Sequence, residues 1–128
     1  MAVRLTQVCI DAVDVDLVAG FWAEALGWRR VTDEDGDVVL RDPSGVAGIE
    51  VLVLGVPEPK TVKNRLHLDI RPLGTTQADE LERLLALGAT PADVGQGETT
   101  WVVLSDPEGN EFCLLRRPAD AGGPIAAG

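Results

Sequence analysis

The stretch that decides the fold occurs twice in the chain. Residues 38–45 read Val-Val-Leu-Arg-Asp-Pro-Ser-Gly, and residues 102–109 read Val-Val-Leu-Ser-Asp-Pro-Glu-Gly. In each copy an apolar run ends at an Asp-Pro turn, where proline presets φ and the closing glycine accepts a positive φ. Leu26-Gly27 and Leu87-Gly88 form a second matching pair in the same order. Repeats in a consistent order predict a duplicated structural unit.

Outward from the first copy, the sequence predicts one strand, one helix and three further strands. Apolar and polar residues alternate in the first strand, whereas an i, i+4 apolar stripe marks the helix. Asp14 is placed to cap the start of this helix, and Gly27 to end it. The expected elements lie at residues 3–12, 15–26, 28–32, 37–41 and 49–54.

The second copy repeats this plan after the linker Pro57-Glu58-Pro59. In the strand at residues 65–70, we expect Leu66, Leu68 and Ile70 to face the helix, with Arg65, His67 and Asp69 on the opposite face. Thr76 resembles the start of a capping box, and Gly88 ends the helix. Two later strands are expected at residues 99–105 and 111–116.

These elements predict an α+β fold of two tandem βαβββ modules. The modules would cover about residues 3–55 and 64–117 of a single domain, residues 1–117, and residues 118–128 would be a loose tail. Each module has only one helix, so one face of its sheet is left uncovered. We therefore expect a cupped mixed sheet with the helices on its outer face and a small-molecule site in the cup.

Charge and hydropathy exclude several classes of partner. The 128 residues carry a formal net charge of −10, which makes nucleic acid and anionic membrane surfaces poor partners. No apolar run approaches the roughly 18 residues that a membrane span needs. The N-terminus lacks the features of a signal peptide, so a cytoplasmic location is expected. Cys9 and Cys113 lie in apolar runs and are predicted to be buried thiols.

The basic residues are unevenly distributed. Lys60, Lys63, Arg65 and Arg71 are four of the eleven and lie within twelve positions. They fit either a solvated connector or a local anion-binding patch, in which Arg65 would contact the ligand.

Several motifs together resemble the vicinal-oxygen-chelate superfamily, which includes glyoxalase I, bleomycin-resistance proteins and extradiol dioxygenases. Its small glyoxalase-like domain branch is the most similar. The resemblance runs from about Leu5 to Arg117 and rests on Asp14, Phe21-Trp22, Leu26-Gly27, Lys63 to Asp69, and Asp106 to Cys113. It implies the fold described above, a small-molecule ligand and a homodimer.

The metal enzymes of this superfamily take ligands from the first and last strands of each module. Carried over by position, the resemblance implies Gln7 and His67 as one pair of metal ligands, around one Zn, Ni or Fe ion. The last-strand carboxylate position falls on Cys113, whose thiolate would suit zinc. In the first module, ungapped alignment places Ile49 there, so Glu50 would serve only if a bulge restored its register.

Each of the remaining candidate site residues has two possible roles. Glu111 would be a catalytic base in the cup, or a solvated residue after a turn. His67 would contact ligand with Asp69 beside it, or be a structural histidine. Trp101 would wall the pocket, or pack in the core.

Two functions follow from the resemblance. The first is a metal-dependent lyase, isomerase or dioxygenase-like enzyme. The alternative is a metal-free protein that sequesters a ligand, as bleomycin-resistance proteins do.

Overall fold

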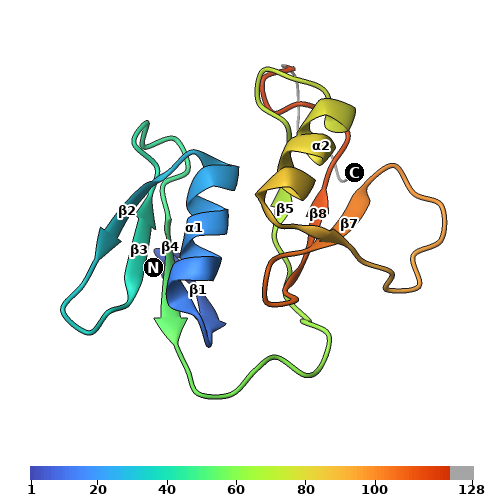
Figure 1. Cartoon of the computed structure of the whole chain (residues 1–128). Helices are drawn as coiled ribbons and strands as arrows, with labels where there is room; N and C mark the ends of the chain where they lie inside the picture. The colour runs from blue at the N-terminus through green and yellow to red at the C-terminus, as the bar shows by residue number, and fades with distance from the viewer. Residues whose placement is uncertain (122–128) are drawn as a thin grey trace. The chain divides into compact units, whose positions relative to one another are not determined.

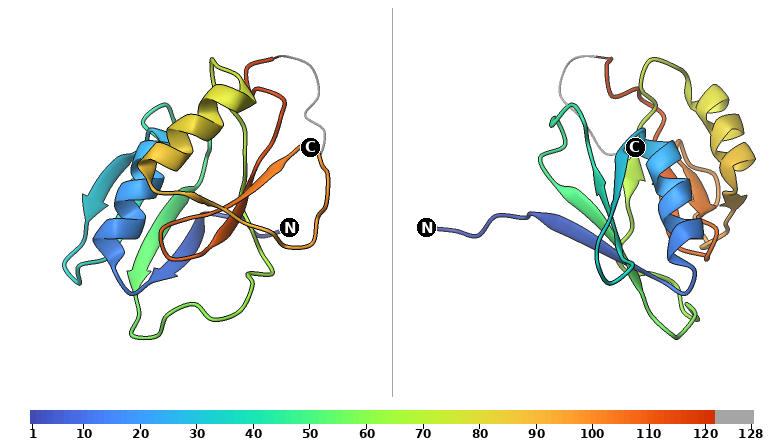
Figure 2. Two further views of the ribbon diagram at one scale, coloured as in Figure 1. Left: turned by 45° about the vertical axis from the view of Figure 1, so that its right-hand side comes forward. Right: turned by 60° about the vertical axis from the view of Figure 1, so that its left-hand side comes forward.

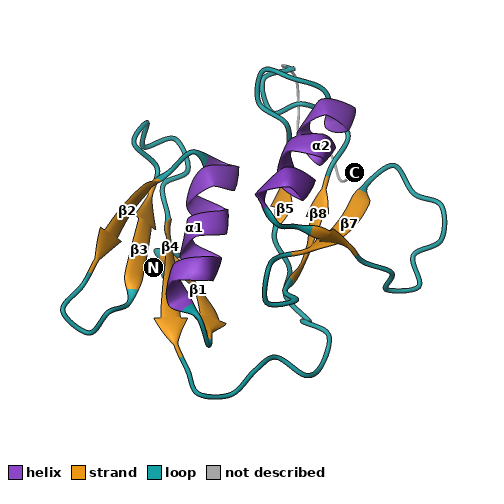
Figure 3. Cartoon of the chain, in the orientation of Figure 1, coloured by secondary structure: helices purple, strands orange, loops and turns teal. Residues whose placement is uncertain are grey.

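The computed structural model describes residues 1–121, which divide into two compact units. Unit 1 comprises Met1–Pro59, and unit 2 begins at Lys60, so the boundary falls at the Pro57-Glu58-Pro59 linker. Each unit has the order strand, helix, three strands (Figures 1 and 3). The two helices and two mixed four-stranded sheets confirm the predicted α+β fold. That the two sheets line one cup stays a prediction.

Unit 1 is a four-stranded sheet covered by one helix. Its strand order is β1-β4-β3-β2, with β1 parallel to β4 and the other neighbours antiparallel. The elements are β1 (Gln7–Ala12), α1 (Val15–Leu26), β2 (Arg29–Thr32), β3 (Val38–Arg41) and β4 (Glu50–Gly55). Figure 2 shows α1 against this sheet from two further directions.

The ends of α1 are set by the residues expected from the sequence. The Asp14 side chain accepts a hydrogen bond from the backbone N–H of Leu17, and Gly27 ends the helix with φ of 69°. The helix buries Val18, Phe21 and Trp22. Leu17, which belongs to the apolar stripe of the sequence, is 48% exposed and so does not pack in the core as the stripe predicts.

Unit 2 repeats the arrangement with shorter strands, in the order β5-β8-β7-β6. The elements are β5 (Asp69–Ile70), α2 (Gln77–Leu87), β6 (Thr90–Pro91), β7 (Val102–Ser105) and β8 (Glu111–Leu114). β5 is parallel to β8, and β7 is antiparallel to both β8 and β6. Thr76 caps α2 through the backbone N–H of Asp79, and Gly88 follows the last turn, as predicted.

β5 is much shorter than the predicted strand. Leu66 is 90% exposed, so its predicted place on the helix face is wrong. Before β5, the Glu111 carboxylate accepts the backbone N–H of Asn64 at 3.2 Å, so a side chain and not a strand ladder holds this segment at that point. The sequence also did not predict β6, because a two-residue strand containing Pro91 has almost no strand pattern.

The C-terminal segment is bound at its beginning. The backbone N–H of Ala119 donates to the Pro72 carbonyl at 2.7 Å, and the Asp120 carboxylate accepts from Gly74 N–H at 3.2 Å. The tail predicted to be loose from residue 118 thus has hydrogen bonds at residues 119 and 120, and its remainder, residues 122–128, lies outside the described residues. No helix within residues 1–121 is long and apolar enough to cross a membrane.

The Asp106 turn joins β7 to β8 around a buried carboxylate. Asp106 is only 2% exposed. Its oxygens accept hydrogen bonds from the backbone N–H groups of Glu108 and Asn110 and from the Asn110 side chain, at 2.9 to 3.0 Å. Removing the carboxylate would leave buried donors without a partner.

We therefore expect Asp106→Ala to lower the free energy of unfolding by roughly 2–4 kcal/mol, because buried donors lose charged acceptors. The measurement is chemical denaturation followed by circular dichroism. Asp42→Ala, in the equivalent turn of unit 1, is the matched control and should cost less, because Asp42 is less buried. Equal losses in the two variants would contradict this account of the Asp106 turn.

Candidate functional site

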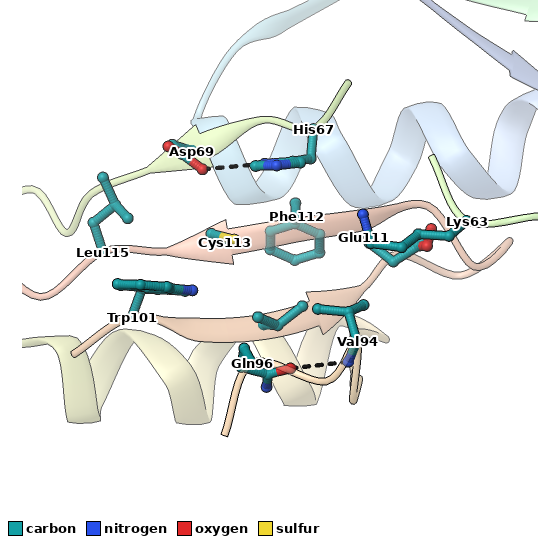
Figure 4. Close-up of a pocket in the computed structure, with 11 residues that line it drawn as sticks. Lys63, His67, Asp69, Val94, Gln96, Trp101, Glu111, Phe112, Cys113 and Leu115 are labelled. Carbon is teal, nitrogen blue, oxygen red and sulfur yellow. Dashed lines mark hydrogen bonds and ion pairs between the residues drawn. The ribbon is translucent and has the colours of Figure 1, made fainter. Parts of the chain in front are cut away.

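A pocket of about 350 Å³ opens on one face of the unit 2 sheet (Figure 4). Along β8 the fully buried Phe112 and Leu114 alternate with Cys113 and Leu115. Successive strand residues point to opposite faces, so Glu111, Cys113 and Leu115 share the pocket face. The lining residues come from β5 and the segment before it, from β7 and β8, and from the loop after β6: Lys63, His67, Asp69, Val94, Gln96, Trp101, Val103, Glu111, Phe112, Cys113 and Leu115.

One side of this pocket is apolar. Trp101 lies immediately before β7, Val103 lies in β7 and Leu115 follows the end of β8, and all three line the pocket. Trp101 is 37% exposed, so it walls the pocket and the expectation of a core tryptophan is wrong. Half-exposed aromatic surface beside a cavity is suited to contact with a planar ligand.

Glu111 lies at the other end of the pocket and is held by two neighbours. It is only 9% exposed, which overturns the expectation of a solvated residue after a turn. Its carboxylate pairs with the Lys60 ammonium at 2.7 Å and accepts the Asn64 backbone N–H at 3.2 Å. The turn after Asp106 places Glu111 at the first position of β8. From this position the Glu111 carboxylate contacts both Lys60 and Asn64.

These contacts decide the charge of Glu111. Burial opposes ionisation and is the largest single influence, but the hydrogen bonds from Lys60, from Asn64 and from the backbone of Glu111, with the charge of Lys60, together lower the pKa of Glu111. An efficient general base has a pKa near the working pH. The environment of Glu111 is therefore a poor fit to the predicted catalytic base.

His67, Asp69 and Cys113 converge on the pocket between β5 and β8. Asp69 and Cys113 are register partners in the parallel pair. His67 Nδ1 lies 3.5 Å from Asp69 Oδ1, and one donor atom from each of the three residues lies within 4.8 Å of the others. Figure 4 shows the imidazole and the carboxylate directed toward each other above Cys113.

The two cysteines differ in exposure. Cys113 is buried, as predicted, and burial followed by the charge of Asp69 raises the pKa of its thiol. Cys9 is exposed, so its predicted burial is wrong. It lies on the same alternating face of β1 as the exposed Gln7, and not on the face of the buried Ala12.

In unit 1 the structure brings Gln7 and Glu50 together. They are register partners in the parallel pair of β1 and β4, and Gln7 Nε2 donates to Glu50 Oε1 at 3.2 Å. No bulge interrupts this pairing, although the sequence predicted that Glu50 would need one. The one-residue offset of Glu50 from the aligned position of Ile49 is instead accommodated in the preceding turn, where Asp42 also binds the backbone N–H of Ala47.

Glu50 is also bound by a basic side chain. Arg41 Nε donates to Glu50 Oε2, and this hydrogen bond, followed by the one from Gln7, lowers the pKa of Glu50. Each predicted glutamate therefore has a cationic partner within its own unit, Arg41 for Glu50 and Lys60 for Glu111. A metal ion at either glutamate would therefore have to compete with that cationic partner for the carboxylate oxygens.

Several residues that line the pocket were not predicted from the sequence, and one predicted ligand-binding residue does not line it. Val103 and Leu115 could have been found from strand alternation, because they share the faces of Trp101 and Cys113. Val94 and Gln96 lie in an irregular loop with no such pattern. Arg65 is exposed and is absent from the lining of the unit 2 pocket, so its ligand contact stays a prediction.

Solved structures with the same fold include resistance proteins and an enzyme. A glyoxalase/bleomycin resistance protein from Albidiferax ferrireducens T118 is 20% identical, with a TM-score of 0.61 over 89% of this chain and 98% of that one. A glyoxalase-related enzyme from Fulvimarina pelagi is 16% identical, with a TM-score of 0.66 over 97% and 99% of the two chains.

A third similar structure contains a metal and a small molecule. It is a variant of the fosfomycin resistance protein FosX from Listeria monocytogenes, complexed with Mn(II) and 1S,2S-dihydroxypropylphosphonic acid. It is 15% identical, with a TM-score of 0.65 over 90% of each chain. At these identities the likeness establishes the fold alone. Among curated proteins, none matches this chain.

The sequence itself matches a family model. The model for the glyoxalase-like domain matches residues 7–115, which include both sheets and both helices. The match begins at Gln7, the first residue of β1, and ends one residue after β8. The chain therefore belongs to the glyoxalase-like domain family, within the vicinal-oxygen-chelate superfamily that its motifs indicated.

Proposed function

We propose that this glyoxalase-like protein binds a small, partly apolar molecule in the pocket of unit 2. The observation that carries this proposal is the division of that pocket into an apolar wall and a polar side. Pockets of this kind bury the apolar part of a ligand and orient it with a few polar groups.

The apolar wall favours a ligand with a planar portion. Trp101, Val103 and Leu115 supply continuous apolar surface, and Trp101 retains exposed ring area for stacking. Gln96 contributes less to recognition, because its side-chain oxygen already accepts the Val94 backbone N–H at 2.9 Å. Orientation of the ligand would fall to Lys63, His67 and Asp69.

The ion pairs of Glu50 and Glu111 favour ligand binding without a metal ion at either glutamate. Glu50 is paired with Arg41 and Glu111 with Lys60, so an ion at either carboxylate would have to compete with a cationic side chain. Sequestration of a ligand needs no catalytic base, and one neighbour of the same fold is named a glyoxalase/bleomycin resistance protein. A homodimer and a cytoplasmic location remain predictions for this protein.

A metal-dependent lyase or isomerase is the second candidate. One observation favours it, the convergence of His67, Asp69 and Cys113 beside the pocket. An ion there would supply Lewis-acid chemistry to an oxygen of the bound molecule. The chain's own residues would position that molecule against Trp101 and exclude water with Val103 and Leu115.

Binding is tested with the fluorescent aromatic anion 8-anilinonaphthalene-1-sulfonate, measured by calorimetry on the full chain. We expect one site, and an affinity reduced about ten- to hundredfold by Trp101→Ala, because burying a large apolar side chain against a ligand contributes roughly 1.5–3 kcal/mol. Trp28→Phe, which changes a half-buried tryptophan of unit 1, is the matched control and should leave the affinity unchanged.

Unchanged affinity in Trp101→Ala, with native near-ultraviolet circular dichroism, would refute the proposed site. The titration is repeated in excess EDTA. Undiminished binding supports the metal-independent function, whereas loss of binding supports the second candidate.

The Lys60–Glu111 pair gives a pH-dependent prediction. The folded-state pKa of Glu111 is lowered, so its stabilising contribution is complete above the unfolded pKa and is lost as the pH falls through the folded pKa. At pH 7 we expect Lys60→Met to cost about 2–3 kcal/mol by leaving a buried carboxylate unpaired. The double variant Lys60→Met/Glu111→Gln should recover part of this loss.

The measurement is urea denaturation of the three proteins between pH 7 and about pH 3, which spans the usual pKa of glutamate. The difference in unfolding free energy between wild type and Lys60→Met should shrink toward acid pH. A difference that stays constant with pH would show that the pair does not act through the charge of Glu111.

A further inference from the structure

We infer that the ligand of the unit 2 pocket is an elongated organic acid, with its anionic group beside Lys63 and its apolar body against Trp101 and Leu115. This inference rests on the proposed function and narrows it to one class of ligand. Among the clustered basic residues it selects Lys63, which lines the pocket, and not Arg65, which does not.

The segment that carries Lys63 is fixed to the beginning of β8. Lys60 pairs with Glu111 at 2.7 Å, and the backbone N–H of Asn64 donates to the same carboxylate at 3.2 Å. The Asn64 side chain also donates to Asn110 Oδ1 at 2.9 Å. Lys63 lies between these two anchored residues, so its backbone is held at the edge of the pocket before a ligand binds. A group positioned in advance loses less freedom on binding.

Lys63 supplies a positive charge that its neighbours do not cancel. Lys60 and Glu111 offset each other's charge. Within residues 1–121, Lys63 has no ion pair, and its ammonium donates only to the backbone carbonyl of Asn64, at 3.1 Å. An ammonium group has three N–H donors, so two remain for the oxygens of an anionic ligand.

Asp69 is the second carboxylate that lines the pocket, and it lies away from the Lys63 end. Figure 4 shows Lys63 near Glu111. Asp69 pairs in register with Cys113, which is two residues farther along β8, about 7 Å in an extended strand. The Asp69 carboxylate instead faces His67 Nδ1 at 3.5 Å. An anionic group beside Lys63 therefore avoids direct contact with Asp69.

The charge of Lys63 also reaches the floor of the pocket. Burial and the charge of Asp69 raise the pKa of the Cys113 thiol, and the charge of Lys63 opposes this rise. Exposed charges farther away than about 8 Å are largely screened at physiological ionic strength. The formal net charge of −10 over the whole chain therefore does not prevent an anion from binding here.

The apolar end of the pocket is fixed by one amide group. Trp101 precedes β7 and Leu115 follows β8, so neither belongs to a strand. Gln77 Nε2 donates to the backbone carbonyls of Thr100 and Leu114, at 2.9 and 3.0 Å. These carbonyls immediately precede the two wall residues. The bridge from the first residue of α2 thus holds both of them in place before a ligand binds.

The separation of the two ends sets the length of the ligand. Figure 4 shows Lys63 and Glu111 at one end of the pocket and Trp101 and Leu115 at the other. From Glu111 to Leu115 the chain advances by four residues, about 13 Å in an extended strand. A ligand that contacts both ends needs an acid group on an apolar body about two rings long. The cavity of about 350 Å³ accepts a molecule of this size.

The test compares two ligands of the same shape by calorimetry on the full-length protein. Biphenyl-4-carboxylate is an anion at neutral pH, and biphenyl-4-carboxamide is its uncharged counterpart. We expect wild type to bind the carboxylate at least about tenfold more tightly, as for a hydrogen bond between charged groups. Lys63→Met should abolish this preference, and Lys63→Arg should retain most of it. The preference should also shrink as the salt concentration rises.

Arg116→Met is the matched control, because Arg116 is an exposed cation of unit 2 that does not line the pocket. It should leave the preference unchanged. The comparison of the two ligands on wild type depends on no variant. Failure of the carboxylate to bind, equal affinity of wild type for both ligands, a preference that survives Lys63→Met, or an equal loss in Arg116→Met would overturn the inference.

The inference and the proposed function fail in different ways. If both ligands bind wild type equally and Trp101→Ala weakens both, the ligand is not selected as an acid, but the small-molecule pocket stands. If the carboxylate is preferred through Lys63 and Trp101→Ala changes neither affinity, the proposed pocket is wrong, and the apolar half of this inference is wrong with it.

Discussion

The buried carboxylate of Asp106 is the interaction on which the unit 2 site depends. It binds two backbone N–H groups and one side-chain amide in the turn between β7 and β8, and so fixes where β8 begins. That starting point places Glu111 and Cys113 on the pocket face and sends Phe112 and Leu114 to the core. A shift of one residue would exchange these two sets, because side chains alternate along a strand. One carboxylate thereby determines which chemistry faces the pocket.

The glutamates Glu50 and Glu111, one in each sheet, bind other side chains of the protein. Glu50 binds Arg41 and Gln7, and Glu111 binds Lys60 and the backbone of Asn64. These contacts hold both glutamates ionised, yet they also occupy the oxygen atoms that a metal would need. The remaining group of donors is His67, Asp69 and Cys113, which differs in hardness from a glutamate-rich centre.

The fold was predictable from the sequence to a greater extent than the site. Helix caps at Asp14 and Thr76 and the repeated Asp-Pro turns are local features, so the residues themselves indicate them. The place of Glu50 was not predictable, because it depends on how the turn after Asp42 accommodates its residues. The burial of Glu111 depends on Lys60 and Asn64, about fifty residues earlier in the chain, and no local pattern reports such a contact. The exposure of Cys9 was missed because an apolar run does not reveal which of its faces is covered.

The parallel pairing at one edge of each sheet has a consequence for the order of folding. β7 and β8 are joined by a short turn, whereas Asp69 meets Cys113, and Gln7 meets Glu50, only after more than forty residues of intervening chain. Closing a long loop costs more entropy than closing a short one, so the hairpins form early and the strands β1 and β5 join them late. In unit 2 the late strand is short and adjoins His67. We therefore expect the segment that carries the imidazole to join the sheet after the β7–β8 hairpin has formed, so that the pocket is completed late in folding.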